Sequence, residues 1–417
     1  MEMEGSTMPG LSRPSSDDSS PSICYDIVFH MPIGAVGGEA VHSRWYKITV
    51  HAGGSQEVDG EKLQMISPFW KGNHHQDYSF ATLGSDLYCV GGHRCYRSVA
   101  EYDSDSPLPF VRNVYKLDIN HPDNNWVPVP KMICPRLQPH TFVIGGNKLF
   151  VWDGHYCCFP PVRLEDNAFD DEVFNDPIIN YSSSDDELFD GFVMDYTFPT
   201  TIPDAEVFDP ILNEWEVLPD PPGRMPYDGF IIAALENPDR ILVASSCFPG
   251  DSDHRWADFY TYDVGDGCWR ELERHQRKLH RHCPLGWCGK PLTVANTLYW
   301  LLHNARLLAY DLELDVWFLG NLSVLGNSFF NEDDPSFIPS FVHLDNHRFC
   351  FLQRASDSCL HCSIVDVSRK LKERRLDITV VCLLEYKMDH ATRISDCLLL
   401  GKQSRNEVQI REEAKQE

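Results

Sequence analysis

Two short stretches of the chain combine cysteine with histidine, the side chains that bind zinc and other soft metals. They are HRHCPLGWC, with His280, His282, Cys283 and Cys288, and CLHC, with Cys359, His361 and Cys362. Strong zinc motifs contain two Cys-x-x-Cys knuckles or a matching His pair, which neither stretch supplies. We therefore predict that these side chains belong to ordinary strands and loops, and that the chain holds no metal or other cofactor.

Motifs of nucleophilic or phosphate chemistry are also missing from the sequence. It contains no Gly-x-Ser-x-Gly, no phosphate-binding glycine loop and no His-Glu-x-x-His. The glycine-rich residues 34–38 lie between two predicted strands with no helix after them, which favours a turn. The sequence thus predicts no catalytic residue.

The clearest pattern in the chain is a repeat that ends in tryptophan. Its four copies end at Trp126, Trp215, Trp269 and Trp317. In three copies an aspartate lies six positions before the tryptophan, namely Asp209, Asp263 and Asp311. We predict structural roles for both residue types: the tryptophan packs between neighbouring units, and the aspartate accepts backbone N–H groups in a turn.

Each of the four copies, and a fifth unit without the tryptophan, begins with two short apolar strands joined by a turn rich in Gly, Asn, Asp or Pro, which predicts a hairpin. These second strands are LYCVGG, LFVWDG, ILVASS, LYWLLH and FCFLQR. A third strand carries the Tyr-Asp or Phe-Asp pair, and a fourth begins at the tryptophan. Four short strands per repeat predict an all-β fold of the β-propeller type.

The repeat is similar to kelch repeats, in particular those of plant kelch and F-box/kelch proteins. The resemblance rests on Gly91-Gly92 closing a second strand, on the Tyr/Phe-Asp strand, and on a tryptophan with prolines after it, as in WVPVP and WEVLP. It implies a propeller, for which we predict six blades, with seven as the alternative. The N-terminal strands and the strand RISDCLLLG are expected to share the closing blade. Relatives often carry an F-box, and the first 22 residues are too few for one.

Length, charge and composition limit the partners. The 417 residues carry a formal net charge of −26, which argues against nucleic acid and anionic membranes and favours a basic protein partner. The 15 cysteines are spread along the chain and the N-terminus lacks an apolar signal core, so we expect a cytoplasmic or nuclear protein that is not secreted. We expect a disordered N-terminus (1–22), one propeller domain (23–401) and a polar tail (402–417).

A long acidic insertion interrupts the second repeat at about residues 160–200. Residues 164–223 contain 17 Asp and Glu and no Lys, Arg or His. Acids alternate there with aromatic side chains, a composition typical of either an interaction segment or a merely solubilising one. The predicted partner-binding residues are Phe169, Phe174, Tyr181, Asp185, Asp186, Glu187 and Phe189. Ser182, Ser183 and Ser184 each precede an acid by three residues and are possible phosphorylation sites.

A second segment of unusual charge, the basic stretch RELERHQRKLHRH, follows Trp269. We predict that it either forms a solvated loop or contributes Arg274, Arg277, Lys278 and Arg281 to partner binding. In a four-stranded meander, the connection between the second and third strands and the one leaving the fourth emerge at the same end. The acidic insertion and the basic segment should therefore share one face, with residues 369–375 on the opposite face.

Two functional classes remain open from the sequence. The favoured one is a non-catalytic interaction module or scaffold, possibly a substrate receptor, that presents loops to a protein partner. The alternative is a lyase, epimerase or hydrolase with its site at the centre of the propeller. Convergence of several His, Asp or Glu side chains on one mouth of the centre would favour the enzyme.

Overall fold

The computed structural model describes most of the chain between residues 23 and 404, and its regular elements are β-strands apart from two short 3-10 turns. The all-β class predicted from the sequence is confirmed. The described residues are 23–33, 41–51, 64–74, 78–92, 112–136, 138–145, 147–152, 203–222, 230–236, 238–247, 255–285, 290–302, 305–326, 339–356, 358–389 and 394–404.

The first sheet joins strands from the two ends of the described chain, in the order β25-β1-β2-β4. Its strands are β1 (Ile23–Ile33), β2 (Val41–His51), β4 (Trp70–His74) and β25 (Asp396–Ser404). β25 runs antiparallel to β1 and places Asp396 opposite His30. The predicted pairing of N- and C-terminal strands in one sheet is therefore confirmed.

The next three sheets are antiparallel meanders of four consecutive strands each. The first contains β5 (Ser79–Leu83), β6 (Asp86–Val90), β7 (Val114–Asp118) and β8 (Val127–Val129), with the turn η2 (Pro122–Asn124) before β8. The second contains β9 (His140–Ile144), β10 (Lys148–Trp152), β11 (Ala205–Asp209) and β12 (Glu214–Val217). The third contains β13 (Phe230–Leu235), β14 (Arg240–Cys247), β15 (Trp256–Asp263) and β16 (Cys268–Lys278).

The last sheet has nine strands, because two meanders of four are linked through their outer strands and one further short strand joins them. One meander contains β17 (Leu292–Val294), β18 (Thr297–Leu302), β19 (Arg306–Asp311) and β20 (Val316–Asn321), followed by η4 (Ser323–Leu325). The other contains β21 (Ser340–Asp345), β22 (Arg348–Ser356), β23 (Cys359–Lys370) and β24 (Arg375–Met388). A parallel bridge between Leu319 and Arg375 links them, and β3 (Gln64–Ile66) pairs with β24.

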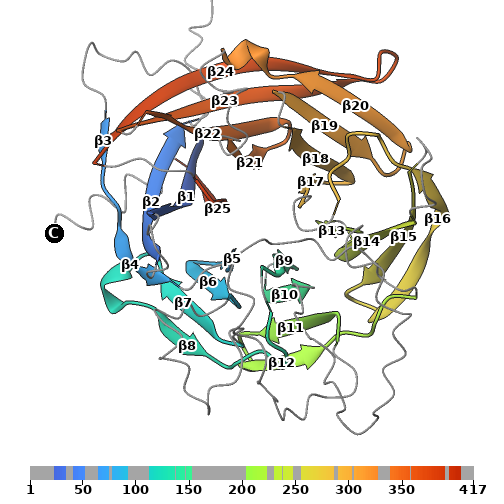
Figure 1. Cartoon of the computed structure of the whole chain (residues 1–417), viewed down its shortest axis with the longest axis horizontal. Coiled ribbons are helices and arrows are strands. Elements are labelled where there is room, and N and C mark those ends of the chain that lie inside the picture. The colour runs from blue at the N-terminus through green and yellow to red at the C-terminus, as the bar shows by residue number, and fades with distance from the viewer. Residues whose placement is uncertain are drawn as a thin grey trace, which may run out of the picture.

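The four-strand groups are arranged in a ring (Figure 1). The innermost strands contact one another in a circle that runs β25, β5, β9, β13, β17, β21 and back to β25. Each buried apolar cluster combines side chains of two neighbouring groups. A strand covered on both faces needs apolar residues on both, which explains why Leu87 to Val90 and Ile241 to Ala244 are continuously buried.

Residues that tolerate a left-handed backbone shape the turns between the third and fourth strands. Asn213, Gly267 and Asp315 have φ values of 58°, 64° and 55°, each two residues before a repeat tryptophan. Gly91 and Gly92 also have positive φ, 72° and 95°. A Cβ on Gly91 would lie 2.5 Å from the carbonyl oxygen of Arg136, so only glycine fits there.

Candidate functional site

Three titratable side chains lie at the end of the molecule where the innermost strands begin. His140 is the first residue of β9, Asp396 is the first of β25, and Lys290 precedes β17. The Lys290 ammonium donates a hydrogen bond to the carbonyl oxygen of Thr141 across 3.1 Å. Since β13 separates β9 from β17 in the circle of innermost strands, Lys290 reaches past one whole four-strand group. We define His140, Lys290 and Asp396 as the central cluster.

Electrostatics in the central cluster differ from those of exposed side chains. Desolvation lowers the pKa of Lys290, and the nearby Asp396 carboxylate partly opposes that change. Desolvation raises the pKa of Asp396 to about 6, with Lys290 opposing. Yet solvent reaches both side chains, because Lys290 is exposed and Asp396 is partly exposed. Both groups therefore have many protein atoms nearby and are still in contact with water.

The chemistry available to the central cluster is narrow. The six innermost strands begin with Ser79, His140, Phe230, Leu292, Ser340 and Asp396. Only one carboxylate is present in that set, so paired carboxylates for acid–base work are absent among the described strand starts. The Thr141 hydroxyl already contacts the Ser79 hydroxyl at 2.9 Å and donates to the Phe80 carbonyl at 2.9 Å. The cluster can recognise a polar group, but these described residues lack a nucleophile with its base.

The predicted partner-binding residues fall into two sets. Phe169, Phe174, Tyr181, Ser182, Ser183, Ser184, Asp185, Asp186, Glu187 and Phe189 lie outside the described residues. In the basic segment, the backbone of Arg274 belongs to β16. Lys278 and Arg281 are exposed. Those two side chains are available to a partner.

Arg277 has a different environment from the other basic residues of its segment. Its side chain is buried, and it donates to the Tyr310 hydroxyl at 3.0 Å and to the Leu312 carbonyl at 2.7 Å. Its guanidinium also lies over the ring of Phe259, 5.5 Å from the centroid. Arg277 therefore joins β16 to β19 of the next group, and we remove it from the partner-binding set.

Lys278 ends β16, and Arg281 lies in the hydrogen-bonded turn that follows it. The Leu279 amide donates to the Arg255 carbonyl at 2.8 Å, and the Cys283 amide donates to the His280 carbonyl at 2.8 Å. The Arg255 guanidinium donates to the Cys283 carbonyl at 3.1 Å. His280 packs on Trp317, and desolvation, aided by the positive charges of His282 and Arg281, lowers its pKa.

Strand register places the attachment points of the acidic insertion and this turn at corresponding ends of their sheets. β10 ends at Trp152, which pairs with His140 on one side and with Ala205 on the other. β10 therefore ends, and β11 begins, at the end of the sheet where β9 begins. Lys278 pairs with Trp256 at the start of β15, which is the equivalent end of the third group. The basic turn 371–374 lies at the opposite end, after the last residue of β23.

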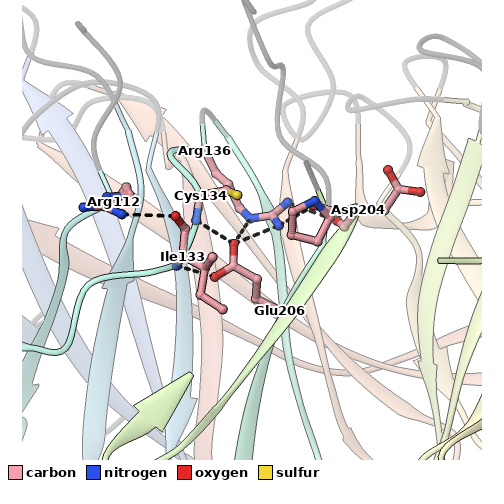
Figure 2. Close-up of polar contacts among 7 residues, drawn as sticks. Arg112, Ile133, Cys134, Arg136, Asp204 and Glu206 are labelled. Atoms are coloured by element: carbon pink, nitrogen blue, oxygen red, sulfur yellow. Dashed lines mark hydrogen bonds and ion pairs between the residues drawn. The ribbon is translucent and has the colours of Figure 1, made fainter. Parts of the chain in front are cut away.

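A buried ion pair anchors the root of the acidic insertion, as Figure 2 shows. Arg136 and Glu206 have fully buried side chains, with a nitrogen–oxygen distance of 3.0 Å. Glu206 also accepts the amides of Ile133 at 2.6 Å and Cys134 at 3.0 Å. The Arg136 guanidinium donates to the carbonyl of Pro203 at 2.9 Å. These bonds hold the start of β11 against the segment after β8, and no sequence motif marked either residue.

Strand alternation divides the potential metal ligands of the CLHC stretch between the two faces of β23, whereas the HRHCPLGWC stretch begins in the turn after β16. Cys283 is buried and Cys288 lies outside the described residues. Cys362 faces Cys350, with a sulfur–sulfur distance of 3.4 Å, whereas Cys359 and His361 share the other face of β23. Glu385 of β24 joins that second pair, and its carboxylate accepts the Cys359 thiol at 2.6 Å. Glu385 was missed in the sequence because it lies on another strand.

No family model and no curated protein matches the chain. Within the described residues, no helix has the length and apolar character needed to cross a membrane.

Proposed function

We propose that this chain is a kelch-like β-propeller of six four-stranded blades that works as a protein-interaction module without catalysis. Six antiparallel four-strand groups and the circle of innermost strands support the blade count. The shared sheet of β25 and β1 supports closure of the ring by both chain ends, a device that leaves few open strand edges.

The scarcity of charged groups at the start of the innermost strands carries the proposal. The described strand starts offer one histidine and one carboxylate, and Lys290 lies two residues before β17, where its positive charge and the negative charge of Asp396 oppose each other. The acidic insertion, which connects β10 to β11, and the basic turn after β16 are instead attached to their sheets at that same end. A binding surface made of loops on a rigid ring is the arrangement that interaction modules use.

The partner expected at this face is a protein with a basic surface patch. The insertion, with 17 acids in residues 164–223, attracts such a patch, and its aromatic side chains bury apolar area once contact is made. Lys278 and Arg281, at the corresponding end of the third group, position acidic residues of the partner. A substrate receptor in a larger assembly would use the same mixed surface.

Affinity purification from the cell of origin tests the module. Tagged full-length chain is compared with a chain lacking residues 165–196 and with Lys278→Glu/Arg281→Glu. The control is Lys372→Glu/Arg374→Glu, which also reverses two positive charges. These residues lie in the turn between β23 and β24, at the end of the sheet opposite the proposed binding face. We expect the first two variants to lose partners in a salt-dependent way and the control to keep them. Recovery of the same partners by all four chains would contradict the proposed face.

An enzyme with its site in the ring centre is the second candidate, favoured by the shifted pKa values of Lys290 and Asp396. The variants Lys290→Met and Asp396→Asn separate the two functions. A module whose partner binds through outer loops keeps its partners in both variants. Loss of a measurable turnover with partners retained would favour the enzyme.

A further inference from the structure

Three potential metal ligands from two strands meet on the outer side of the last four-strand group. Register places His361 of β23 directly opposite Glu385 of β24, and Cys359 lies two residues before His361 on the same face. The Nε2 atom of His361 is 3.7 Å from Glu385 Oε1, and the Cys359 sulfur is 2.6 Å from the same oxygen. The ligand atoms of the three residues all lie within 4.8 Å of one another.

These separations lie within about 1 Å of those that a tetrahedral zinc ion requires. With Zn–S of about 2.3 Å and Zn–N and Zn–O of about 2.0 Å, neighbouring ligand atoms are about 3.3 to 3.5 Å apart. The observed separations of 2.6 Å and 3.7 Å lie on either side of that value. Replacing the thiol proton by a metal ion therefore needs side-chain shifts of about 1 Å, which rotamer adjustment supplies without moving the strands.

Gln353 provides a second observation at the same place. It pairs with His361 from β22, on the side away from Glu385, and its side chain is only 4% exposed. Its Oε1 atom has no hydrogen-bond partner among the described residues, which is costly for a buried acceptor. A metal-bound histidine donates its other ring N–H to an acceptor of this kind. Register puts Gln353 on the β22 side of His361, opposite Glu385, where its amide oxygen would accept the ring N–H that does not face the metal.

We propose that Cys359, His361 and Glu385 bind one Zn²⁺ ion, with Gln353 as the acceptor that orients His361. One cysteine, one histidine and one carboxylate form a ligand set that suits zinc, a borderline-soft ion, better than magnesium or calcium. Exposure rises outward across the site: the side chain of His361 is 27% exposed and that of Glu385 46%. The fourth coordination position therefore faces solvent, where a water molecule or a partner's side chain completes the tetrahedron.

Burial and the hydrogen bond to Glu385 raise the pKa of the Cys359 thiol to about 11, so the metal-free thiol keeps its proton. Zinc binding breaks the S–H bond and forms a Zn–S bond, and the proton leaves to solvent. No electron is transferred in this exchange. The ion also ties the outermost strand β24 to β23 through side chains, in addition to their backbone ladder.

Cobalt titration of the purified full-length protein tests the site. We expect one Co²⁺ per chain, with the visible bands of tetrahedral cobalt and a sulfur-to-cobalt charge-transfer band, all displaced by one equivalent of Zn²⁺. Cys359→Ser removes the charge-transfer band. The matched control is Cys382→Ser. Cys382 lies on β24 in the same sheet, but its side chain packs against the apolar cluster on the other face. Absence of binding, or a band that survives in Cys359→Ser, overturns the proposal.

Two further variants keep the test decisive if Cys359→Ser folds poorly. Glu385→Gln changes a half-exposed side chain, and we expect it to weaken Co²⁺ binding with no loss of thermal stability in the absence of metal. Gln353→Leu removes the unpaired acceptor, so metal-free stability is unchanged or higher while metal affinity falls by about 10- to 100-fold. Wild-type metal affinity in both variants would show that the three side chains form only a Cys–Glu hydrogen bond beside a histidine.

Discussion

The indole N–H of Trp269 in β16 donates a hydrogen bond to the carbonyl oxygen of Pro219 across 2.8 Å. Pro219 follows β12, the outer strand of the preceding group. The same bond recurs when Trp215 donates to Pro130 at 2.8 Å and when Trp317 donates to Lys278 at 3.0 Å. In these three groups the repeat tryptophan therefore connects its own group to the end of the outer strand of the preceding group.

Removing this connection at Trp269 should destabilise the fold in two separable steps. Trp269→Phe keeps a ring but loses the N–H, and we expect a cost of about 1 kcal/mol. Trp269→Ala also loses the edge-on contact with Trp152, whose ring centroid is 5.6 Å away. Because Trp269 is half-buried, its removal should cost about 2 to 3 kcal/mol, below the range for fully buried tryptophan. Urea unfolding measures both values.

Trp256→Phe is the matched control for this series, because Trp256 is 41% exposed at the start of the neighbouring strand β15. We expect its unfolding free energy to stay close to that of the wild type. Equal losses in Trp256→Phe and Trp269→Phe would show that the bond to Pro219 contributes nothing.

The repeat aspartate should stabilise the turn that leads to each tryptophan. Asp263 Oδ1 accepts the amides of Gly265 and Asp266, each at 3.0 Å. Asp263→Ala leaves both amides to water and should cost about 1 to 2 kcal/mol, whereas Asp263→Asn retains an acceptor oxygen and should cost less. Thermal unfolding of the two variants gives the order. A larger loss in the Asn variant would contradict the role of this side chain as an acceptor.

The ion pair at the root of the acidic insertion predicts a larger effect. Arg136→Met leaves Glu206 as a buried carboxylate with its two amide donors but without its counter-ion, which should cost about 3 to 5 kcal/mol. Adding Glu206→Gln to Arg136→Met removes the unpaired charge and should recover part of the loss. The double-mutant cycle is measured by urea unfolding, and additive single losses would contradict direct coupling.

Local sequence patterns predicted the parts of this fold that depend on neighbours along the chain. The segment from Asp263 to Trp269 contains a complete turn and the start of the next strand. The residues that this turn needs are therefore close together in the sequence and can be recognised there. Arg277 shows the limit, since its neighbours are basic and polar, yet Tyr310 and Phe259 from other strands bury it. Glu385 shows the same limit, because only sheet register brings it to Cys359 and His361.

The central cluster makes a prediction about pH with a definite sign. The pKa of Asp396 rises from about 4 in an unfolded chain to about 6 in the fold, mainly through desolvation. A raised carboxyl pKa means that folding disfavours the ionised form, so stability is lost as the pH rises through about 6. Asp396→Asn lacks this penalty. The variant should match the wild type near pH 4 and be more stable above pH 6, by about 1 to 2 kcal/mol after allowing for the solvent that reaches the site.

Lys290 supplies the internal check for this prediction. Its positive charge lowers the pKa of Asp396 against the larger effect of desolvation, so Lys290→Met should make ionised Asp396 more costly. In that background, Asp396→Asn should therefore stabilise the protein more at about pH 8 than it does in the wild type. Urea unfolding of the four chains at about pH 4 and about pH 8 measures the difference. A stabilisation by Asp396→Asn that is independent of pH, or that shrinks in Lys290→Met, would show that the two groups do not share an enclosed space.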